Sequence, residues 1–534
     1  MGKEITTDDR KWIWKFAIIV MVITTLPYIY AYVNAGPDLE FSGFFVGAED
    51  GNSYVAKMIR GWGGDWLFRS PYTTMLQNGM IAFVPYYLLG KLLSHPDIHT
   101  QAVVLIQLMR IAIIYPFCLL IYTLSKMIIK TEQSRRVVTV LGILGGGAGW
   151  LYPLGLSNLW GSELPLEFYS PESFGFLAIF SFPHLVFAKT LLLVGFLWLL
   201  TSGNISSQIR TWFPGLSWFL LGFFQPLTIV TGWMVACSYL LVEVVRNKAY
   251  IFKNILIVRE LILKASVLLI TSSPWVIYNF IAFRNDAYLK IWQQQNIILS
   301  PPIFHYLLAY IFILPLVLLG IKNIVYTRNR YGWFFITWLF IFPLLAYFPN
   351  NLQRRLPEDF WVCLCIVAGV ALDSLKTRRR LVIPLLLACL LSTLIILAGS
   401  VLSITKKTLP IYHDKEFIEL VKSLYKVEGY NQKVIASYNT SNILPAYIPV
   451  FVYIGHGPES ANLAHIQPAI ETLYQTNQSE LEKCQYLMQV SADYLIWGVE
   501  EKKLGSWRPI NSPCLYETYQ SSHYSLFSVI RDSQ

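Results

Sequence analysis

Charged side chains are scarce in this sequence. Only 14% of its 534 residues are Asp, Glu, Lys or Arg, whereas 55% are hydrophobic. Soluble domains carry about 25% charged residues, and a soluble protein of this length divides into several cores, each with a solvated surface. Because the charges here are too few to cover such surfaces, the composition excludes an ordinary soluble protein.

The sequence also lacks the local motifs of several ligand classes. It has no Walker phosphate loop, no dinucleotide fingerprint and no zinc-ligand spacing. The net charge of +10 can indicate nucleic-acid binding, but the Lys and Arg stand in short clusters between apolar runs. That distribution is typical of membrane topology, so we expect no nucleic-acid partner.

Long apolar runs dominate the first three quarters of the chain. Runs of about 20 residues match the roughly 30 Å of hydrocarbon in a bilayer. We therefore expect a mostly α, polytopic α-helical membrane protein with about eleven transmembrane helices. The predicted spans are 12–33, 101–126, 137–155, 178–201, 212–224, 227–245, 262–282, 303–321, 332–348, 359–375 and 381–403.

Lys and Arg set the expected orientation in the plasma membrane. With the N-terminus in the cytoplasm, the inside segments hold more than twice as many Lys and Arg as the outside loops, as the positive-inside rule requires. An odd number of spans then places the C-terminus outside. The apolar segment 77–93 contains Asn78, Pro85 and Lys91, and we interpret it as an interfacial or re-entrant helix within a long first outside loop, 34–100.

The composition changes near residue 404. We expect a transmembrane domain at 1–403 and a small extracytoplasmic α/β domain at 404–534. Short apolar runs predict strands at 433–437, 450–454, 494–498 and 524–530, and the intervening segments predict helices at 413–427, 461–476 and 479–490.

Cysteine usage in the C-terminal domain predicts one disulfide. Cys484 and Cys514 are the only cysteines of this domain, and an oxidising compartment favours their pairing. The same domain contains the sequence Gly-His-Gly-Pro-Glu-Ser at 455–460, which follows a predicted strand. We assign it no chemistry, because neither a nucleophile partner nor a glycine-rich phosphate loop accompanies it.

Two adjacent carboxylates, Glu49 and Asp50, follow the first span within about 20 residues. An amphipathic stretch at 54–60 comes directly after them. A carboxylate fixed at the membrane surface can take a proton from an acceptor, and it can help to hold a divalent cation. The alternative is an ordinary polar loop in which Asp-Gly marks a turn.

The arrangement of the acidic pair, Tyr54 one helical turn on, an interfacial segment at 71–93, many spans and an outside C-terminal domain resembles the GT-C class of membrane glycosyltransferases. The resemblance covers the whole chain in layout and rests on a short motif. It implies a polyprenyl-phosphate sugar donor, an acceptor that stays unknown, and a catalytic carboxylate at Asp50 or else at Glu49. It also allows a divalent cation, Mg²⁺ or Mn²⁺, at Asp50 and Glu172.

One departure from the GT-C pattern concerns the branch of the class. The protein O-mannosyltransferases carry a His-Pro-Pro motif in the first outside loop. The corresponding region here reads Arg69-Ser70-Pro71-Tyr72. This favours another branch and leaves the acceptor open.

The second outside loop holds Glu163, Glu167 and Glu172 and no basic residue. In the GT-C class an acidic group of this loop often contacts the metal or the acceptor. We expect that role for Glu172, which follows Pro171 at the mouth of the next span, and secondarily for Glu167. The alternative is a set of solvated loop acids.

Basic groups near the expected membrane surface are candidates for the donor phosphate. His184 and Lys189 lie within a span, where ionisable groups cost several kcal/mol unless they are paired or hydrated. Arg354 and Arg355 lie in an outside loop, against the positive-inside trend, and guanidinium groups bind phosphate through two parallel hydrogen bonds. The alternatives are a His184 satisfied by a backbone carbonyl and an Arg355–Glu358 pair that anchors the loop.

The resemblance therefore implies a glycosyltransferase that moves a sugar from a polyprenyl-phosphate carrier to an acceptor on the extracytoplasmic face by a single displacement. A rival from another class is a multi-pass transporter or flippase, which needs broken spans or charges along a path through the membrane. Arg110, His184 and Lys189 allow that alternative. A third is a non-enzymatic assembly protein whose C-terminal domain binds a partner.

Overall fold

The computed structural model describes residues 5–161, 163–201, 208–247, 251–375, 380, 382–428 and 430–531. The expected inside loops at 202–211 and 376–380 therefore lie largely outside the described residues. The chain divides into two compact units, each of which is described by itself. The first comprises Met1–Pro27, Gln107–Phe280 and Ile298–Ser400, and the second comprises Tyr28–Ile106, Ile281–Ile297 and Val401–Gln534.

The first unit is built from packed helices, in which α13 lies against α15, α7 against α8, and α15 against α5. Most of these helices are almost wholly apolar. The helices that lie in it or enter it are α1 Thr7–Val33, α4 Ile98–Lys126, α5 Glu132–Leu144, α6 Gly175–Ser181, α7 Pro183–Leu200, α8 Gln208–Phe224, α9 Pro226–Asn247, α10 Ile251–Asn285, α12 Ile303–Tyr310, α13 Leu314–Thr327, α14 Arg330–Ala346, α15 Phe360–Leu375 and α16 Ile383–Lys406. Short 3₁₀ and π turns connect them at Ala148–Leu151, Tyr152–Leu156, Ser157–Trp160, Leu166–Phe168 and Gln353–Arg355.

Six helical segments are long and apolar enough to cross a membrane: α1, α4, α7, Pro226–Arg246, Val258–Asn285 and α16. Two bent pairs, Glu132–Leu144 with Ala148–Trp160 and Ile303–Tyr310 with Leu314–Thr327, raise the number to eight if each is one span. Each expected span falls on one helix or on consecutive helices. The apolar helices thus support a membrane location, while the count of eleven and the orientation stay predictions.

The helix expected across 77–93 is much shorter in the structure. Only α3, Val84–Gly90, is helical there, and seven residues rise about 10 Å, too little to cross a bilayer. The helix cannot extend backwards, because Phe83 adopts a left-handed conformation at φ 53° and Gly79 one at φ 82°. Pro85 lies in the first turn, where its missing N–H costs nothing.

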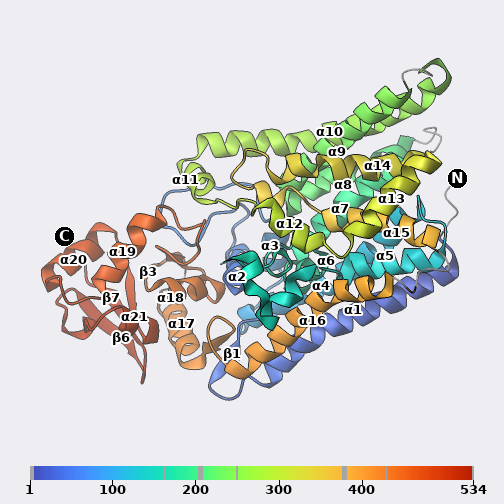
Figure 1. Cartoon of the computed structure of the whole chain (residues 1–534). Coiled ribbons are helices and arrows are strands. Elements are labelled where there is room, and N and C mark those ends of the chain that lie inside the picture. Colours follow the sequence, from blue (N-terminus) through green and yellow to red (C-terminus); the bar gives the residue numbers. More distant parts are fainter. Residues whose placement is uncertain are drawn as a thin grey trace. The chain divides into compact units, whose positions relative to one another are not determined.

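A five-stranded sheet in the order β4-β3-β5-β7-β6 lies near the C-terminal end of the chain (Figure 1). β3 is parallel to β4 and β5, whereas β7 is antiparallel to β5 and β6. The strands are β3 Lys433–Ile435, β4 Phe451–Val452, β5 Tyr494–Trp497, β6 Leu515–Gln520 and β7 Ser525–Val529. The helices are α17 Lys415–Glu428, α18 Tyr438–Ile443, α19 Leu463–Leu473, α20 Glu480–Gln489 and α21 Val499–Leu504, with 3₁₀ turns at Leu444–Ala446 and Pro509–Asn511.

This sheet confirms the four expected strands, and α17, α19 and α20 confirm the three expected helices. β6 was not expected from the sequence; its residues alternate between less and more exposed positions and include several polar side chains. The structure also places a disulfide between Cys484 and Cys514, the pairing that the sequence predicts.

The second unit includes parts of the chain far from its C-terminal segment. These are β1 Leu39–Phe41, α2 Ala48–Trp62, α3 and α11 Ala287–Gln295. β1 pairs antiparallel with β2, Tyr412–Asp414, and Phe41 lies opposite Tyr412. Val55 and Ile59 of α2 belong to the same buried cluster as Leu420 of α17. The first loop and the C-terminal segment therefore share one core, and the expected boundary at 403 stays a prediction.

Candidate functional site

The acidic pair lies in the first turn of α2. The helix begins at Ala48, directly after Gly47, whose φ of 62° suits a residue without a Cβ. Glu49 and Asp50 thus lie at the N-terminal end of the helix, where the peptide dipoles favour negative charge. The side chain of Asp50 is half-exposed, at 51%.

A loop from the C-terminal segment contacts both carboxylates. This is the His456 loop, defined here as residues 455–460. The Nε2 atom of His456 lies 3.2 Å from Oδ1 of Asp50. The N–H of Gly457 donates to Oε1 of Glu49 at 2.9 Å, and the hydroxyl of Tyr438 donates to the same oxygen. The acidic pair is therefore fixed by residues that the first loop does not contain.

Glu459 of the same loop is buried and accepts three hydrogen bonds. Lys57 Nζ lies 2.7 Å from its Oε1, which also accepts from Ser53 at 2.9 Å, while Ser70 donates to its Oε2 at 3.0 Å. Burial would raise the pKa of Glu459, but Lys57 and then His456 hold that pKa below its usual value. Lys57 is itself fully buried, and its Nζ lies 4.3 Å from the ring centre of Phe83.

His456 lies between two carboxylates. Its Nδ1 is 3.8 Å from Oε1 of Glu459, on the side of the ring opposite the Asp50 contact. Burial lowers the pKa of an imidazole, but Glu459 and then Asp50 raise the pKa of His456 above its ordinary value. Charges therefore alternate from the half-exposed Asp50 through His456 and Glu459 to the buried Lys57.

The backbone of the His456 loop is held in a conformation that requires glycine at its first position. Gly455 has a φ of +135°, and a Cβ there would come within 2.7 Å of the backbone nitrogen of Asn442. The Asn442 side chain donates to the carbonyl of Gly455 at 2.7 Å. Tyr288 of α11 donates to the carbonyl of Glu459 at 3.1 Å. Two separate segments of the chain, α18 and α11, thus fix the backbone of this loop.

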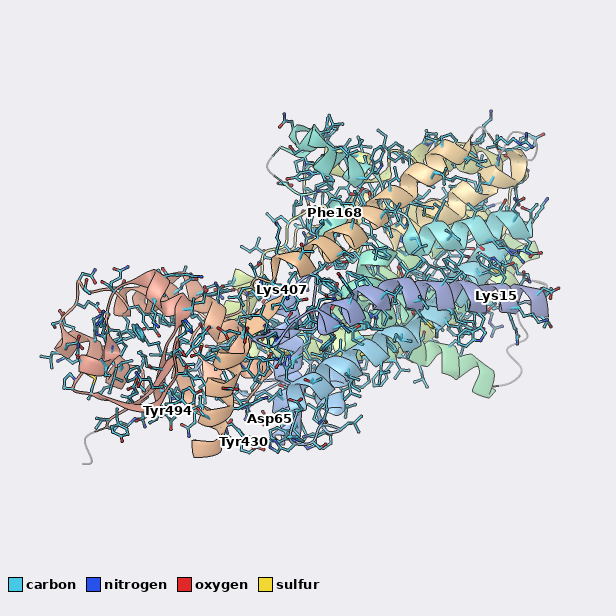
Figure 2. All side chains as sticks on the ribbon, turned by 90° about the horizontal axis from the view of Figure 1, so that it is seen from below. Lys15, Asp65, Phe168, Lys407, Tyr430 and Tyr494 are labelled. Atoms are coloured by element: carbon cyan, nitrogen blue, oxygen red, sulfur yellow. A yellow bond between two sulfur atoms is a disulfide. The ribbon has the colours of Figure 1, made fainter. Side chains whose placement is uncertain are left out.

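The last turn of α2 is tied to the C-terminal segment as well. Arg60 donates from Nε to Oδ2 of Asp65 at 2.8 Å and from Nη1 to Asn431 at 2.6 Å. Figure 2 labels Asp65 and Tyr430, the residue next to Asn431, on the two segments that this arginine joins. Both ends of α2 therefore contact the C-terminal segment, which fixes the direction of the helix.

In the first unit, Lys189 is fully buried between two carboxylates. Its Nζ lies 2.6 Å from Oε1 of Glu358 and 3.3 Å from Oδ1 of Asp359. Glu358 thus pairs with Lys189 and not with Arg355, contrary to the alternative considered from sequence. Nε of Arg355 lies 3.3 Å from Oε1 of Glu172 instead. Lys189 is engaged inside the helical unit by these two carboxylates, so we do not propose it as a ligand of the donor phosphate.

Arg354 and Arg355 share one short 3₁₀ turn, Gln353–Arg355. The guanidinium carbon of Arg354 lies 4.5 Å from the ring centre of Tyr169. Both arginines are partly exposed. His184, in the first turn of α7, is buried at 6% exposure.

Glu167 and Glu172 are buried, so the interpretation of solvated loop acids is wrong for both. Oε1 of Glu167 accepts from the N–H of Gly147 at 2.9 Å and from that of Gly149 at 2.8 Å. Burial raises the pKa of Glu167 to about 7, although these two N–H groups oppose the shift. Glu167 thus holds the turn after α5, and its role towards an acceptor stays a prediction.

The expected divalent cation at Asp50 and Glu172 finds no preformed site. Within the part of the chain that the structure describes, no group of three or more His, Cys, Asp or Glu side chains could hold a metal ion. The cation expected from the sequence therefore stays a prediction, and the mechanism proposed for this chain does not depend on one.

No protein-family model and no curated protein matches the sequence. The fold is similar to that of an archaeal oligosaccharyltransferase. The apo crystal structure of the Archaeoglobus fulgidus oligosaccharyltransferase has a TM-score of 0.56 and 11% identity, over 92% of this chain and 70% of that one. The same organism's AglB in complex with an inhibitory peptide and a dolichol-phosphate gives 0.54 and 10%, over 93% and 70%. ArnT from Cupriavidus metallidurans bound to undecaprenyl phosphate gives 0.45 and 13%, over 97% and 98%. At these identities, the archaeal structures show a common fold.

Sequence reasoning missed His456 and Tyr438 as partners of the acidic pair, and it missed the ion pair of Glu459 with Lys57 beside His456. A weak signal existed, because Glu49, Ser53 and Lys57 lie four residues apart and therefore on one face of a helix. The segment 455–460 follows a predicted strand, but the sequence near it contains no partner for its side chains. Its partner is 406 residues away, a distance over which local patterns carry no information.

Proposed function

We propose that this chain is a GT-C-like membrane glycosyltransferase. It moves a sugar from a polyprenyl-phosphate carrier to an acceptor on the extracytoplasmic face of the plasma membrane. The observation that carries the proposal is the half-exposed carboxylate of Asp50 at the start of α2. The buried His456 contacts this carboxylate through its Nε2 atom. A fixed carboxylate that still faces solvent is what proton abstraction from an acceptor requires.

Asp50 acts as the general base in this proposal. Its carboxylate takes the proton of the acceptor hydroxyl or amide while the acceptor attacks the anomeric carbon of the sugar. The bond from that carbon to the carrier phosphate breaks in the same displacement. Glu49 is less suited to this role, because its Oε1 already accepts from Gly457 and Tyr438.

Arg354 and Arg355 stabilise the phosphate that leaves. Guanidinium groups suit this role because their planar fork donates two parallel hydrogen bonds to a phosphate. Arg355 forms an ion pair with Glu172, whereas the guanidinium group of Arg354 packs over the neutral ring of Tyr169. We therefore give Arg354 the larger role and Arg355 the smaller one.

The structural likeness supports the class of carrier. The Archaeoglobus fulgidus protein of the same fold is described in complex with a dolichol-phosphate, a polyprenyl phosphate. The apolar helices support a bilayer location. In our proposal eleven spans cross this bilayer, the N-terminus is cytoplasmic, and the domain at 404–534 is outside.

The transporter alternative is less favoured by the charges in the helical unit. Arg110 donates to the hydroxyls of Thr24 at 2.6 Å and Thr25 at 2.9 Å, and Lys189 pairs with two carboxylates. Both side chains already have partners within the helical unit, so neither needs a transported substrate to satisfy it. Arg110 is also almost completely buried.

The test of the proposed function is direct. Purified protein is incubated with a panel of polyprenyl-phosphate sugars, and release of the carrier phosphate and formation of a sugar–acceptor product are followed by mass spectrometry. We expect turnover of at least one donor, and loss of that turnover in Asp50→Asn. Movement of a lipid-linked sugar across vesicles without any cleavage would instead support the flippase.

A further inference from the structure

We propose that His456 is the positioning residue of Asp50: as an imidazolium it donates to the Asp50 carboxylate and holds it in the orientation of a base. Glu459 and Lys57 form the support that keeps His456 in place and charged. The role of the His456 loop in the transfer step rests on the proposed function. The interaction between the side chains of His456 and Asp50 is independent of the proposed function.

The geometry fits a donor held from both sides. Nε2 faces Oδ1 of Asp50 at 3.2 Å, and Nδ1 faces Oε1 of Glu459 at 3.8 Å. The backbone N–H of His456 donates to the hydroxyl of Ser460 at 3.1 Å, and the N–H of Ser460 donates to the carbonyl of His456 at 2.9 Å. The ring of Tyr72 lies 5.5 Å from the imidazole, centre to centre. The imidazole therefore has little freedom to turn away from Asp50.

The support behind His456 is buried and ionic. Glu459 is 3% exposed and Lys57 is fully buried, and their ion pair spans 2.7 Å. Without Glu459, Lys57 would repel the imidazolium. With Glu459 between them, the two cations are separated by one anion. The side chain of Asp50 is half-exposed, whereas that of His456 is 7% exposed. Among Asp50, His456, Glu459 and Lys57, the proposed base Asp50 is therefore the residue with substantial exposure to solvent.

Charged and aromatic side chains from several segments of the chain surround His456. Asp50 and Lys57 lie on α2, Glu459 is on its own loop, and Tyr72 belongs to the first loop. Glu49 and Tyr438 lie next to Gly457. Two of these groups, Glu459 and Asp50, raise the pKa of His456, and Lys57 lowers it. A change in either carboxylate should therefore change the pH at which His456 loses its proton.

The proposal predicts which group sets the alkaline limit of the reaction. When His456 loses its proton, the charge-assisted hydrogen bond to Asp50 becomes at most a weaker neutral one, and the Asp50 carboxylate is held less firmly towards the acceptor. Transfer should then fall as the pH rises through the pKa of His456. Asp50 itself takes the acceptor proton and returns it to solvent after the product leaves, so His456 keeps its own proton throughout the cycle.

The first experiment does not depend on activity. The full chain is purified in detergent with ring-labelled histidine, and the imidazole signals are titrated by NMR. His456→Gln assigns the signal. We expect the pKa of His456 to lie above the ordinary value of an imidazole, and to fall in both Asp50→Asn and Glu459→Gln. A pKa that both variants leave unchanged would overturn the proposal, whether or not any transfer is seen.

The second experiment uses the transfer reaction. Gln at position 456 keeps an N–H donor but does not titrate. His456→Gln should therefore flatten the alkaline limb of the kcat profile, keep the KM for the donor, and lower kcat up to about 100-fold, the cost of a misplaced reacting group. The matched control is His523→Gln, because His523 forms an exposed pair with Glu416 in the same unit. An unchanged alkaline limb in His456→Gln would show that His456 does not act through Asp50.

The two experiments separate the two ideas. If no donor is turned over by the wild type, the proposed function fails, and the titration still decides whether Asp50 and Glu459 set the charge of His456. If transfer occurs and the titration shows no coupling, the proposed function stands and His456 is only a packing residue.

Discussion

The Nε2 atom of His456 lies 3.2 Å from Oδ1 of Asp50, although 406 residues separate the two in the sequence. Asp50 is half-exposed and His456 is buried. The carboxylate in this contact thus faces solvent, whereas the imidazole is buried. The consequences can be tested by changing the acidic pair, its surroundings and the expected topology one at a time.

Asp50→Asn should abolish transfer while the protein stays in the membrane. The change keeps the shape of the side chain and removes the base, so we expect a loss between about 10²- and 10⁴-fold, the usual range for a general base. Initial rates of sugar transfer provide the measurement. Glu49→Gln should cost less, because a Gln carbonyl can still accept from Gly457 and Tyr438.

A matched control for Asp50 exists in the same loop. Asp38 is exposed, so Asp38→Asn should leave the rate unchanged. Wild-type rates in Asp50→Asn would refute the mechanism.

Arg354→Lys should weaken donor use markedly, and Arg354→Ala more strongly. Lys keeps the charge but lacks the planar fork that binds a phosphate through two hydrogen bonds. The apparent donor affinity of each variant is the quantity to measure. An unaltered affinity in Arg354→Ala and Arg355→Ala would remove phosphate binding from this turn.

Arg355 needs its own comparison, because it pairs with Glu172. If Arg355 only anchors its turn, then Arg355→Lys should be nearly neutral and Glu172→Gln should behave like Arg355→Ala. If it binds the donor phosphate, Arg355→Ala should weaken donor affinity more than Glu172→Gln does.

Glu167 should make stability depend on pH. Burial raises its pKa to about 7, so its contribution is fully present below the unfolded value near 4.5 and is lost as the pH rises through about 7. The shift corresponds to about 3 kcal/mol. Glu167→Gln should therefore lose less stability than the wild type between pH 5 and pH 8, measured as thermal midpoints in detergent.

The neighbouring Glu163 provides the control for Glu167. Its side chain is 53% exposed, so Glu163→Gln should keep the wild-type dependence of the midpoint on pH. Parallel curves for the wild type and Glu167→Gln would contradict the role of burial at Glu167.

The disulfide should stabilise the C-terminal segment. Cys484 and Cys514 are 30 residues apart, and closing such a loop contributes about 3–4 kcal/mol in the chain-entropy model. Mass spectrometry of non-reduced peptides should find the two cysteines joined, and Cys484→Ser should lower the denaturation midpoint. Two free thiols in non-reduced protein would contradict the pairing.

The orientation can be tested with a reporter that is active only in the cytoplasm. Fused after Gln534, it should give no signal, because eleven spans and a cytoplasmic N-terminus place the C-terminal domain outside. A fusion in the loop after α4, near Lys130, should give a signal and serves as the control. A bright C-terminal fusion would mean that the number of spans is even.

Much of the fold could be predicted because apolar runs determine it locally. The spans fall on helices, and the short runs at 433–437 and 494–498 are β3 and β5. The helix expected across 77–93 was predicted too long. Gly79 and Phe83 adopt positive φ values that end the helix, and amino-acid composition does not indicate such values. β6 was missed because the polar Glu517 lies on its less exposed face and interrupts the apolar–polar alternation.

The site could be predicted only in part. Glu49 and Asp50 were visible because they follow a span directly. The roles of Lys189 and Glu358 were not, because two buried charges that pair through 2.6 Å look like independent candidates in a sequence. His456 was hidden for the same reason. Pairing between distant charges depends on tertiary structure, and a single sequence does not contain that information.

The short pairing of β1 with β2 bears on how this protein could be altered by recombination. Leu39–Phe41 and Tyr412–Asp414 are neighbours in one small sheet, and the acidic pair lies a few residues after β1. A crossover that exchanges only the segment after residue 403 would replace the partners of Glu49 and Asp50 and keep the pair itself. A working chimera should therefore take both segments from the same parent, although almost the whole membrane region separates them in the gene.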